Sequence, residues 1–203
     1  MFDSIINKVL GLFKNEVEKK ISNVINAKSI KLDSLPTTTE EFIQFRDKMA
    51  VTPEGGAVSF IVACILYTQN KQLGRECAII QTDASQLQPS NSGYKGFDLT
   101  ASNNNMLIQL DTKPYIAYSY IQETSNENGY QLPNAPFTFY IERTEPTDGG
   151  KYMKVFIRST GADTARPIRL SKNDKGIWKG MEYSSILVGV NPPKLSGEKA
   201  GDF

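Results

Sequence analysis

The sequence contains no histidine, and this absence excludes several familiar kinds of active site. Ser-His-Asp and Cys-His catalytic arrangements need an imidazole base, and His-ligated metal and haem sites need imidazole ligands. Catalysis by carboxylates, tyrosine or lysine stays chemically open, but no spacing of these residues forms a recognisable constellation. We therefore favour a non-catalytic protein and expect no cofactor and no metal.

Cysteine is scarce, since Cys64 and Cys77 are the only two among 203 residues. Both lie in a stretch that we predict to be helical, and one continuous helix would separate them by about 20 Å. A disulfide cannot span that distance. We expect two small buried thiols in a reducing compartment.

Long apolar runs and an excess of charge are also missing. No stretch approaches the roughly 20 apolar residues that span a bilayer, and Asp3, Lys8 and Lys14 interrupt the segment where a secretory signal would stand. A cytoplasmic location is the simplest inference. The formal net charge is only +1, so nothing attracts the whole chain to nucleic acid and we expect no nucleic-acid partner.

Residues 2–25 carry the clearest periodic signal, with apolar side chains at three- and four-residue steps. We predict an amphipathic helix within residues 1–31, a segment that holds six lysines against three acidic residues. Its apolar face needs a partner, which is its own domain, another copy, a second protein or an anionic membrane surface. The residues that we assign to this interaction face are Phe2, Ile5, Ile6, Val9, Leu10, Phe13 and Val17.

Helix signals come first in the body of the chain. Residues 37–41 twice place a threonine three residues before a glutamate, and Thr52 with Pro53 marks a second helix start. We predict a helix after each signal. The remaining predictions here are helices over residues 73–81 and 102–110, a linker over 27–36 and a loop over 86–96.

Strand signals follow, because β-branched and aromatic residues alternate with polar ones between turn-forming segments. The fold class is therefore α+β, with N-terminal helices packed on a mostly antiparallel sheet of four to six strands. A single domain of this kind covers residues 32–193, and residues 194–203 form a polar tail. The predicted strands are residues 115–122, 137–143, 152–159, 168–171 and 177–190, the last broken near Ser184.

The last strands concentrate positive charge and aromatic rings. Residues 151–180 hold eight basic and two acidic side chains, a local charge of +6. Two-residue alternation puts Tyr152, Lys154, Phe156 and Arg158 on one face of their strand. Such a face could bind nucleic acid, because its rings could stack on bases and its cations could contact phosphates. We favour the other interpretation, a solvated sheet face whose lysines discourage edge pairing with another sheet.

A candidate small-molecule site rests on the same region. Asp163 and Arg166 bracket a turn, where we expect an Asp–Arg clasp that fixes the loop. Beside a pocket, Arg166 would recognise an anion, and the many tyrosines could line that pocket. The residues that we assign to ligand binding are Arg158, Asp163, Arg166, Trp178 and Tyr183.

Several short segments are distinctive as a set. They are residues 35–37, 52–57, 93–98, 113–117, 119–120, 128–133, 161–163 and 166–168, together with Trp178. Through them, the chain resembles, from about residue 35 to 193, an uncharacterised family of bacterial proteins known as a domain of unknown function. The resemblance implies a bacterial source and a single family domain, but it implies no reaction and no catalytic residues.

Three functional hypotheses follow. The leading one is a non-catalytic binding or assembly module of a bacterial cytoplasm, which acts through its aromatic sheet and N-terminal helix. The alternatives are a pocket protein for a small, anionic ligand and a peripheral membrane protein.

Removal of residues 1–31 tests the N-terminal helix. If its apolar face mediates self-association, light scattering should find the full chain oligomeric and residues 32–203 monomeric. Equal oligomeric states for both chains would contradict this hypothesis. The membrane alternative instead predicts that the full chain co-floats with anionic vesicles at low salt.

Overall fold

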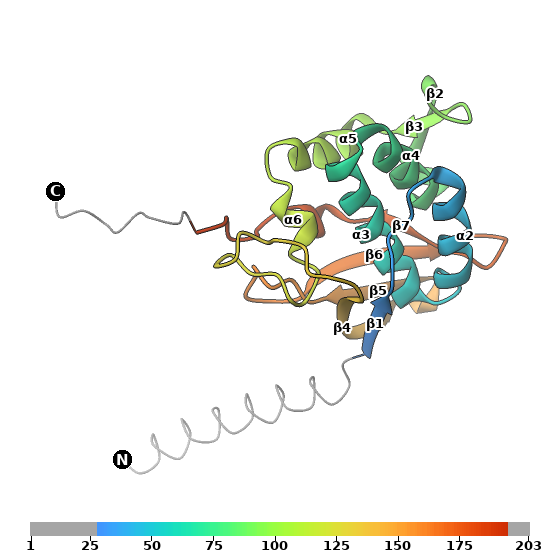
Figure 1. Cartoon of the computed structure of the whole chain (residues 1–203). Helices are drawn as coiled ribbons and strands as arrows, with labels where there is room; N and C mark the ends of the chain where they lie inside the picture. The colour runs from blue at the N-terminus through green and yellow to red at the C-terminus, as the bar shows by residue number, and fades with distance from the viewer. Residues whose placement is uncertain (1–27, 195–203) are drawn as a thin grey trace, which may run out of the picture.

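The computed structural model describes residues 28–194 and has the α+β architecture that the sequence predicts. Helices cover one face of a five-stranded antiparallel sheet, and a separate two-stranded hairpin projects beside them (Figure 1). The helices are α2 (Thr39–Met49), α3 (Pro53–Gln69), α4 (Lys71–Gln81), α5 (Ala101–Leu107) and α6 (Tyr115–Tyr118). The strands are β1 (Lys28–Leu32), β2 (Leu87–Tyr94), β3 (Phe97–Leu99), β4 (Phe137–Thr147), β5 (Tyr152–Ile157), β6 (Arg166–Lys172) and β7 (Trp178–Glu182).

The large sheet has the strand order β1-β4-β5-β6-β7, with antiparallel neighbours throughout. Its inner face is apolar because alternate residues of the central strands point toward the helices: Val155, Ile168 and Leu170 are all fully buried. The predicted break of the last strand is confirmed, since β7 ends at Glu182 and a turn of 3-10 helix covers Ser184–Leu187. The predicted continuation of the strand to residue 190 is wrong, because no strand follows this turn in the part of the chain that the structure describes.

Helix α3 is the centre of the core. Its residues from Gly55 to Tyr67 are buried without interruption, as expected for a helix that is apolar on every side. The predicted start is confirmed, because the Thr52 hydroxyl accepts a hydrogen bond from the amide of Gly55 and Pro53 occupies the first turn. The sheet lies against one side of α3, and α2, α4 and α6 contact its other sides.

The capping signal before α2 is also confirmed. The Thr38 hydroxyl accepts a hydrogen bond from the Glu41 amide at 3.1 Å. The Glu41 carboxylate accepts in turn from the Thr37 amide at 2.7 Å. This second bond is the main reason why the pKa of Glu41 lies below its usual value.

The predicted linker over residues 27–36 is wrong for residues 28–32, which form strand β1 at the edge of the sheet. Ile30 and Leu32 alternate with Lys31, but the strand is too short and too rich in lysine to stand out in the sequence. A boundary between residues 31 and 32 cuts this strand. The truncation described above should therefore start at residue 28 rather than at residue 32.

The predicted loop over residues 86–96 is wrong as well, because Leu87–Tyr94 is strand β2. Its composition of Pro, Ser, Asn and Gly hid the strand. Lys95 and Gly96 both have positive φ, 48° and 84°, which closes a tight turn into β3.

The predicted strand over residues 115–122 is wrong: the segment begins with helix α6 and continues as turns. Its buried members do not follow the two-residue alternation of a half-buried strand. They are Ile116, Ala117, Ser119, Tyr120 and Ile121. Pro114 precedes the helix with a φ of −59°, which suits a helical start.

The predicted N-terminal helix, with Phe2, Ile5, Ile6, Val9, Leu10, Phe13 and Val17, lies outside the described residues. Of the predicted polar tail, only Lys194 is described. The hypotheses on these two segments stay predictions.

The two cysteines are free and buried, as the sequence predicts. They lie on two helices, α3 and α4, rather than on one. Burial raises the pKa of both thiols, that of Cys77 to about 12, so neither supplies a thiolate nucleophile near neutral pH.

Helices α3 and α4 approach so closely that Gly74 has no room for a side chain. A Cβ atom at this position would lie 2.0 Å from the backbone N of Tyr67. Gly74→Ala should therefore lower the free energy of unfolding by about 3 kcal/mol, measured by urea denaturation. The exposed Gln72→Ala on the same helix is the control and should change stability by less than about 0.5 kcal/mol. Equal stabilities would contradict this helix contact.

Candidate ligand-binding site

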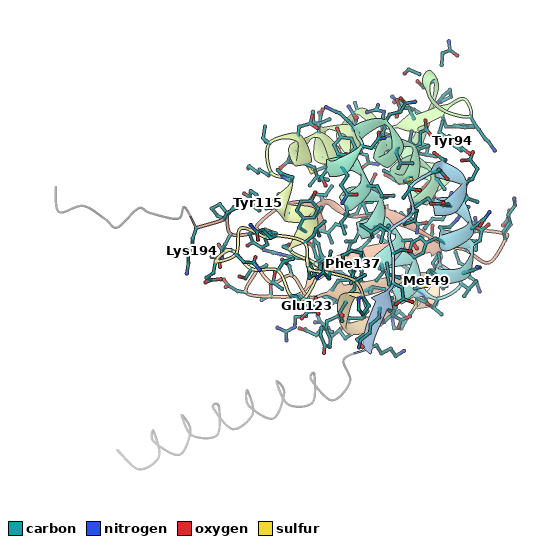
Figure 2. All side chains as sticks on the ribbon, in the orientation of Figure 1. Met49, Tyr94, Tyr115, Glu123, Phe137 and Lys194 are labelled. Atoms are coloured by element: carbon teal, nitrogen blue, oxygen red, sulfur yellow. The ribbon has the colours of Figure 1, made fainter. Side chains whose placement is uncertain are left out.

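A cavity of about 430 Å³ lies where four separate parts of the chain meet. Its walls come from α2, from the end of α4, from the β2–β3 hairpin and from the turn that joins β6 to β7. These elements lie together on one side of the molecule (Figure 1). Tyr94 stands at the hairpin, far from Tyr115 and Lys194 (Figure 2).

Much of the cavity wall is apolar. The Phe97 side chain lines the cavity and is half exposed although it is aromatic. An apolar wall of this kind favours the hydrocarbon part of a small molecule. The apolar lining residues are Ile43, Ile79, Ile80, Leu87, Tyr94, Phe97 and Ile177.

The charged part of the wall is strongly cationic. Arg46, Lys95, Lys175 and Lys179 line it, and Asp47 is the one carboxylate among the lining residues. A cavity with this charge and an apolar wall is suited to an anion that carries a hydrocarbon group.

Arg46 has one carboxylate close to its guanidinium. Only 13% of its side chain is exposed, and its Nε lies 2.9 Å from a carboxylate oxygen of Asp47. That contact is close but poorly aligned, so Nε has no hydrogen-bond acceptor. Nε is thus a buried donor without an aligned acceptor, although Asp47 supplies a negative charge beside it, and the guanidinium can still donate to a carboxylate or phosphate from outside the chain.

Lys179 is half-buried beside Arg46. Burial is the main cause that lowers the pKa of its ammonium group, and the positive charge of Arg46 lowers it further. Asp83 and Asp47 oppose this shift without reversing it. Arg46 and Lys179 therefore lie close enough to repel each other, in a part of the cavity wall that is poorly solvated.

Asp83 is a second nearby acid whose charge favours the ammonium form of Lys179, but its hydrogen bonds go to serines. It accepts hydrogen bonds from the Ser171 hydroxyl and from the amide and hydroxyl of Ser85. Burial raises the pKa of Asp83, yet these hydrogen bonds outweigh it and hold the pKa below its usual value. The carboxylate is thus a fixed structural anion at the end of α4.

The structure separates the residues that the sequence assigns to ligand binding. Arg158 pairs with Glu142 at 2.8 Å on the outer sheet face. Asp163 is exposed, and the predicted clasp is wrong: Arg166 instead donates to the carbonyl of Gly189. The reason is strand alternation, which turns Arg166 to the inner side of the sheet.

Trp178 and Tyr183 lie elsewhere. The Tyr183 ring is buried against Phe60, with 4.1 Å between ring centroids. Trp178 pairs with Lys172, at the opposite end of β6 from Arg166 and roughly 20 Å away along the strand. None of the five assigned residues lines the cationic cavity.

The basic and aromatic outer face of β5 exists as predicted, with Val155 and Ile157 turned to the core. Guanidinium groups stack on its rings, Arg143 over Phe156 at 3.4 Å and Arg169 over Tyr152 at 4.1 Å. Acidic residues from outside the 151–180 window neutralise these arginines. The ion pairs are Arg143 with Glu142 and Glu145, Arg158 with Glu142, and Arg169 with Asp148 and Glu182.

A second cavity of similar volume is lined by tyrosines, as the aromatic content suggests. Tyr115 and Tyr130 stack there at 5.6 Å, and the Tyr130 hydroxyl donates to the carbonyl of Asn191 at 2.6 Å. Pro193 closes one side. These contacts hold the end of the domain in place, and the cavity has no charged lining residue.

Sequence reasoning missed Arg46, Lys179 and the hairpin residues. The hairpin was hidden by its loop-like composition, and Lys179 was counted with the outer-face cations. Lys179 stands between Trp178 and Gly180 in a strand, but no local signal shows that its neighbours in space are α2 and α4.

Comparison with known proteins adds one match, which covers most of the chain. Residues 34–194 match the family model described as "Domain of unknown function (DUF6935)". The chain belongs to the DUF6935 family. The resemblance predicted from the sequence is thereby confirmed, whereas the bacterial source stays a prediction. No curated protein and no solved structure matches the chain.

The DUF6935 domain contains the whole cationic cavity, whose lining residues run from Ile43 to Lys179. Within residues 28–194, no helix has the length and apolar character needed to cross a membrane. In the same part of the chain, no three or more Cys, Asp or Glu side chains are grouped so that they could hold a metal ion.

In the ligand-free protein, the mostly buried guanidinium of Arg46 should lower the free energy of unfolding. We expect Arg46→Met to raise the free energy of unfolding by roughly 1 kcal/mol, because the apolar chain keeps the packing and removes the repulsion between Arg46 and Lys179. Lys48→Met on the exposed side of α2 is the control and should change stability by less than about 0.5 kcal/mol. Chemical denaturation measures both. A clear loss of stability in Arg46→Met would show that the Asp47 contact already satisfies the guanidinium.

Proposed function

We propose that the DUF6935 domain binds a small amphipathic anion in the cationic cavity. The observation that carries this proposal is the presence of Arg46 and Lys179 in one partly buried wall, without a free carboxylate to pair with both. An anionic group beside them would relieve their mutual repulsion and supply the missing acceptors. The apolar wall would then cover the hydrocarbon part of the ligand.

The outer sheet face supports a protein-binding or nucleic-acid-binding role less well. Its arginines already have carboxylate partners, so a phosphate or an acidic partner would have to displace Glu142, Glu145 or Glu182. Exposed ion pairs contribute little on their own, and this network leaves little net charge for steering. Assembly through residues 1–27 and a peripheral membrane location remain separate proposals.

A matched pair of probes tests the proposed function. We expect 1-naphthoate to bind the full chain, and its neutral analogue 1-naphthalenemethanol to bind at least about tenfold more weakly, in titration calorimetry. Arg46→Met should weaken 1-naphthoate binding by a similar factor. Arg169→Met, which removes a paired arginine from the outer face, is the control and should leave binding unchanged.

The binding should also depend on pH. Protonated Lys179 attracts the carboxylate, so affinity should be constant below the lowered pKa of Lys179 and fall as the pH rises through it. The fall should begin at a lower pH than an ordinary lysine would give. Equal affinities for acid and alcohol, or no effect of Arg46→Met, would refute the proposed function.

A further inference from the structure

The tyrosine-lined cavity is separate from the cationic one, and the two share no lining residue. Figure 2 shows them far apart, since Tyr94 lines the cationic cavity and Tyr115 lines the other. The tyrosine-lined cavity has a volume of about 430 Å³, which is in the range of ligand sites. Among the described residues, no charged side chain lines it. An uncharged occupant therefore suits this cavity.

Two tyrosines of α6 form a fixed aromatic wall. Tyr115 and Tyr118 both line the cavity and are partly exposed. The buried Tyr130 supports Tyr115 by stacking, with 5.6 Å between the ring centroids and 25° between the ring planes. The Tyr118 hydroxyl is hydrogen-bonded to the hydroxyl of Thr68 in α3 at 2.8 Å. Both rings are thereby held in one orientation, which lowers the entropy lost when a ligand binds.

The position of Tyr130 is unfavourable for the backbone. Its φ is 56°, in the left-handed region that a tyrosine rarely adopts. Its hydroxyl also needs a glycine as neighbour, because a Cβ atom at Gly161 would lie 2.1 Å from that oxygen. The fold accepts both constraints, and the result is a hydroxyl that donates to the carbonyl of Asn191 at 2.6 Å.

The last four described residues show what kind of backbone these tyrosines hold. Asn191, whose carbonyl accepts from Tyr130, precedes Pro192 and Pro193, and Pro193 lines the cavity. A residue before a proline favours the extended or polyproline II conformation, and two successive residues here have that position. The amides of Asn191 and Lys194 donate to backbone carbonyls at 2.8 Å and hold both ends of the segment. Aromatic-lined grooves bind proline-rich peptides in the polyproline II conformation.

We propose that the tyrosine-lined cavity binds an extended, proline-containing segment of another protein. The segment lies beside Pro193, with its proline rings against Tyr115 and Tyr118. The Tyr115 hydroxyl donates to one of its carbonyls, as the Tyr130 hydroxyl does to Asn191. Proline suits such a wall because its ring is apolar and its φ is fixed before binding, so little conformational entropy is lost. This proposal does not depend on the anion site, because the two cavities share no residue.

A titration with hexaproline, acetylated and amidated at its ends, tests this proposal. The full chain carries ¹³C-labelled tyrosine rings, and NMR follows their signals. The peptide adopts polyproline II and has no charge, so the cationic cavity does not attract it. We expect saturable shifts of the Tyr115 and Tyr118 ring signals, with a dissociation constant on the order of 1 mM or lower. A glycine–serine hexapeptide with the same ends should bind at least about tenfold more weakly.

Three variants locate the binding. Tyr115→Ala should weaken hexaproline binding at least about tenfold, and Tyr115→Phe, which keeps the ring and loses the hydroxyl, should weaken it about threefold. Tyr140→Ala removes an exposed tyrosine of β4 and is the control, which should leave binding unchanged. Arg46→Met should also leave it unchanged, because Arg46 lines the other cavity.

The proposal is overturned if hexaproline gives no saturable ring shifts up to on the order of 10 mM, or if the glycine–serine peptide binds equally well. Neither result needs a variant to fold. Ring shifts with maltotriose and none with hexaproline would assign the cavity to a sugar, and ring shifts that follow protein concentration without peptide would assign it to a second copy. Either result would overturn the proposal. Absence of 1-naphthoate binding would refute the proposed function and leave this proposal standing.

Discussion

The complete burial of α3 is the constraint on which the rest of the structure depends. A helix that is apolar on every side has to be covered on every side, and one layer of sheet covers only part of it. The remaining surface is covered by other helices, and glycines permit close contacts. At Gly56 a Cβ atom would lie 2.6 Å from the carbonyl oxygen of Trp178, and at Gly74 it would lie 2.0 Å from Tyr67.

These contacts also build the cavity. Gly56 brings α3 against β7, and Gln81 at the end of α4 donates to the carbonyls of both Gly56 and Trp178 at 2.9 Å. The ends of α2 and α4 are thereby fixed along the edge of β7, where Lys179 stands. The hairpin that follows α4 then closes a space that neither helix nor sheet fills. The candidate site is therefore a consequence of how the central helix is covered.

The sequence predicts the parts of this fold that local chemistry determines. The helix starts at Thr38 and Thr52 are recognisable because each cap needs a hydroxyl at a fixed distance from the first turn. Strand β5 is recognisable because one of its faces is buried and the other is solvated. In contrast, β1 and β2 are strands only because partners pair with them, and α6 was mistaken for a strand because four residues are too few to show a helical period clearly.

The candidate site is harder to predict from the sequence, because it depends on which charged side chains form ion pairs in the folded protein. The outer sheet face carries arginines beside aromatic rings, and each of these arginines forms an ion pair with an acidic residue. The acidic residues are Glu142, Glu145, Asp148 and Glu182. These acids lie outside the basic window of the sequence, so the window looked far more cationic than the folded surface is.

In the cavity the opposite holds. Arg46 and Lys179 are 133 residues apart in the chain, and only Lys179 belongs to the basic window of residues 151–180. Folding brings them together in an apolar setting, while Asp83 is occupied by Ser85 and Ser171. A protein can reduce the cost of such a pair by supplying a carboxylate of its own, as this chain does on its outer face. In the cavity the one lining carboxylate, Asp47, lies against Arg46, and no ion pair forms with Lys179 among the described residues, which is what distinguishes this site from the outer face.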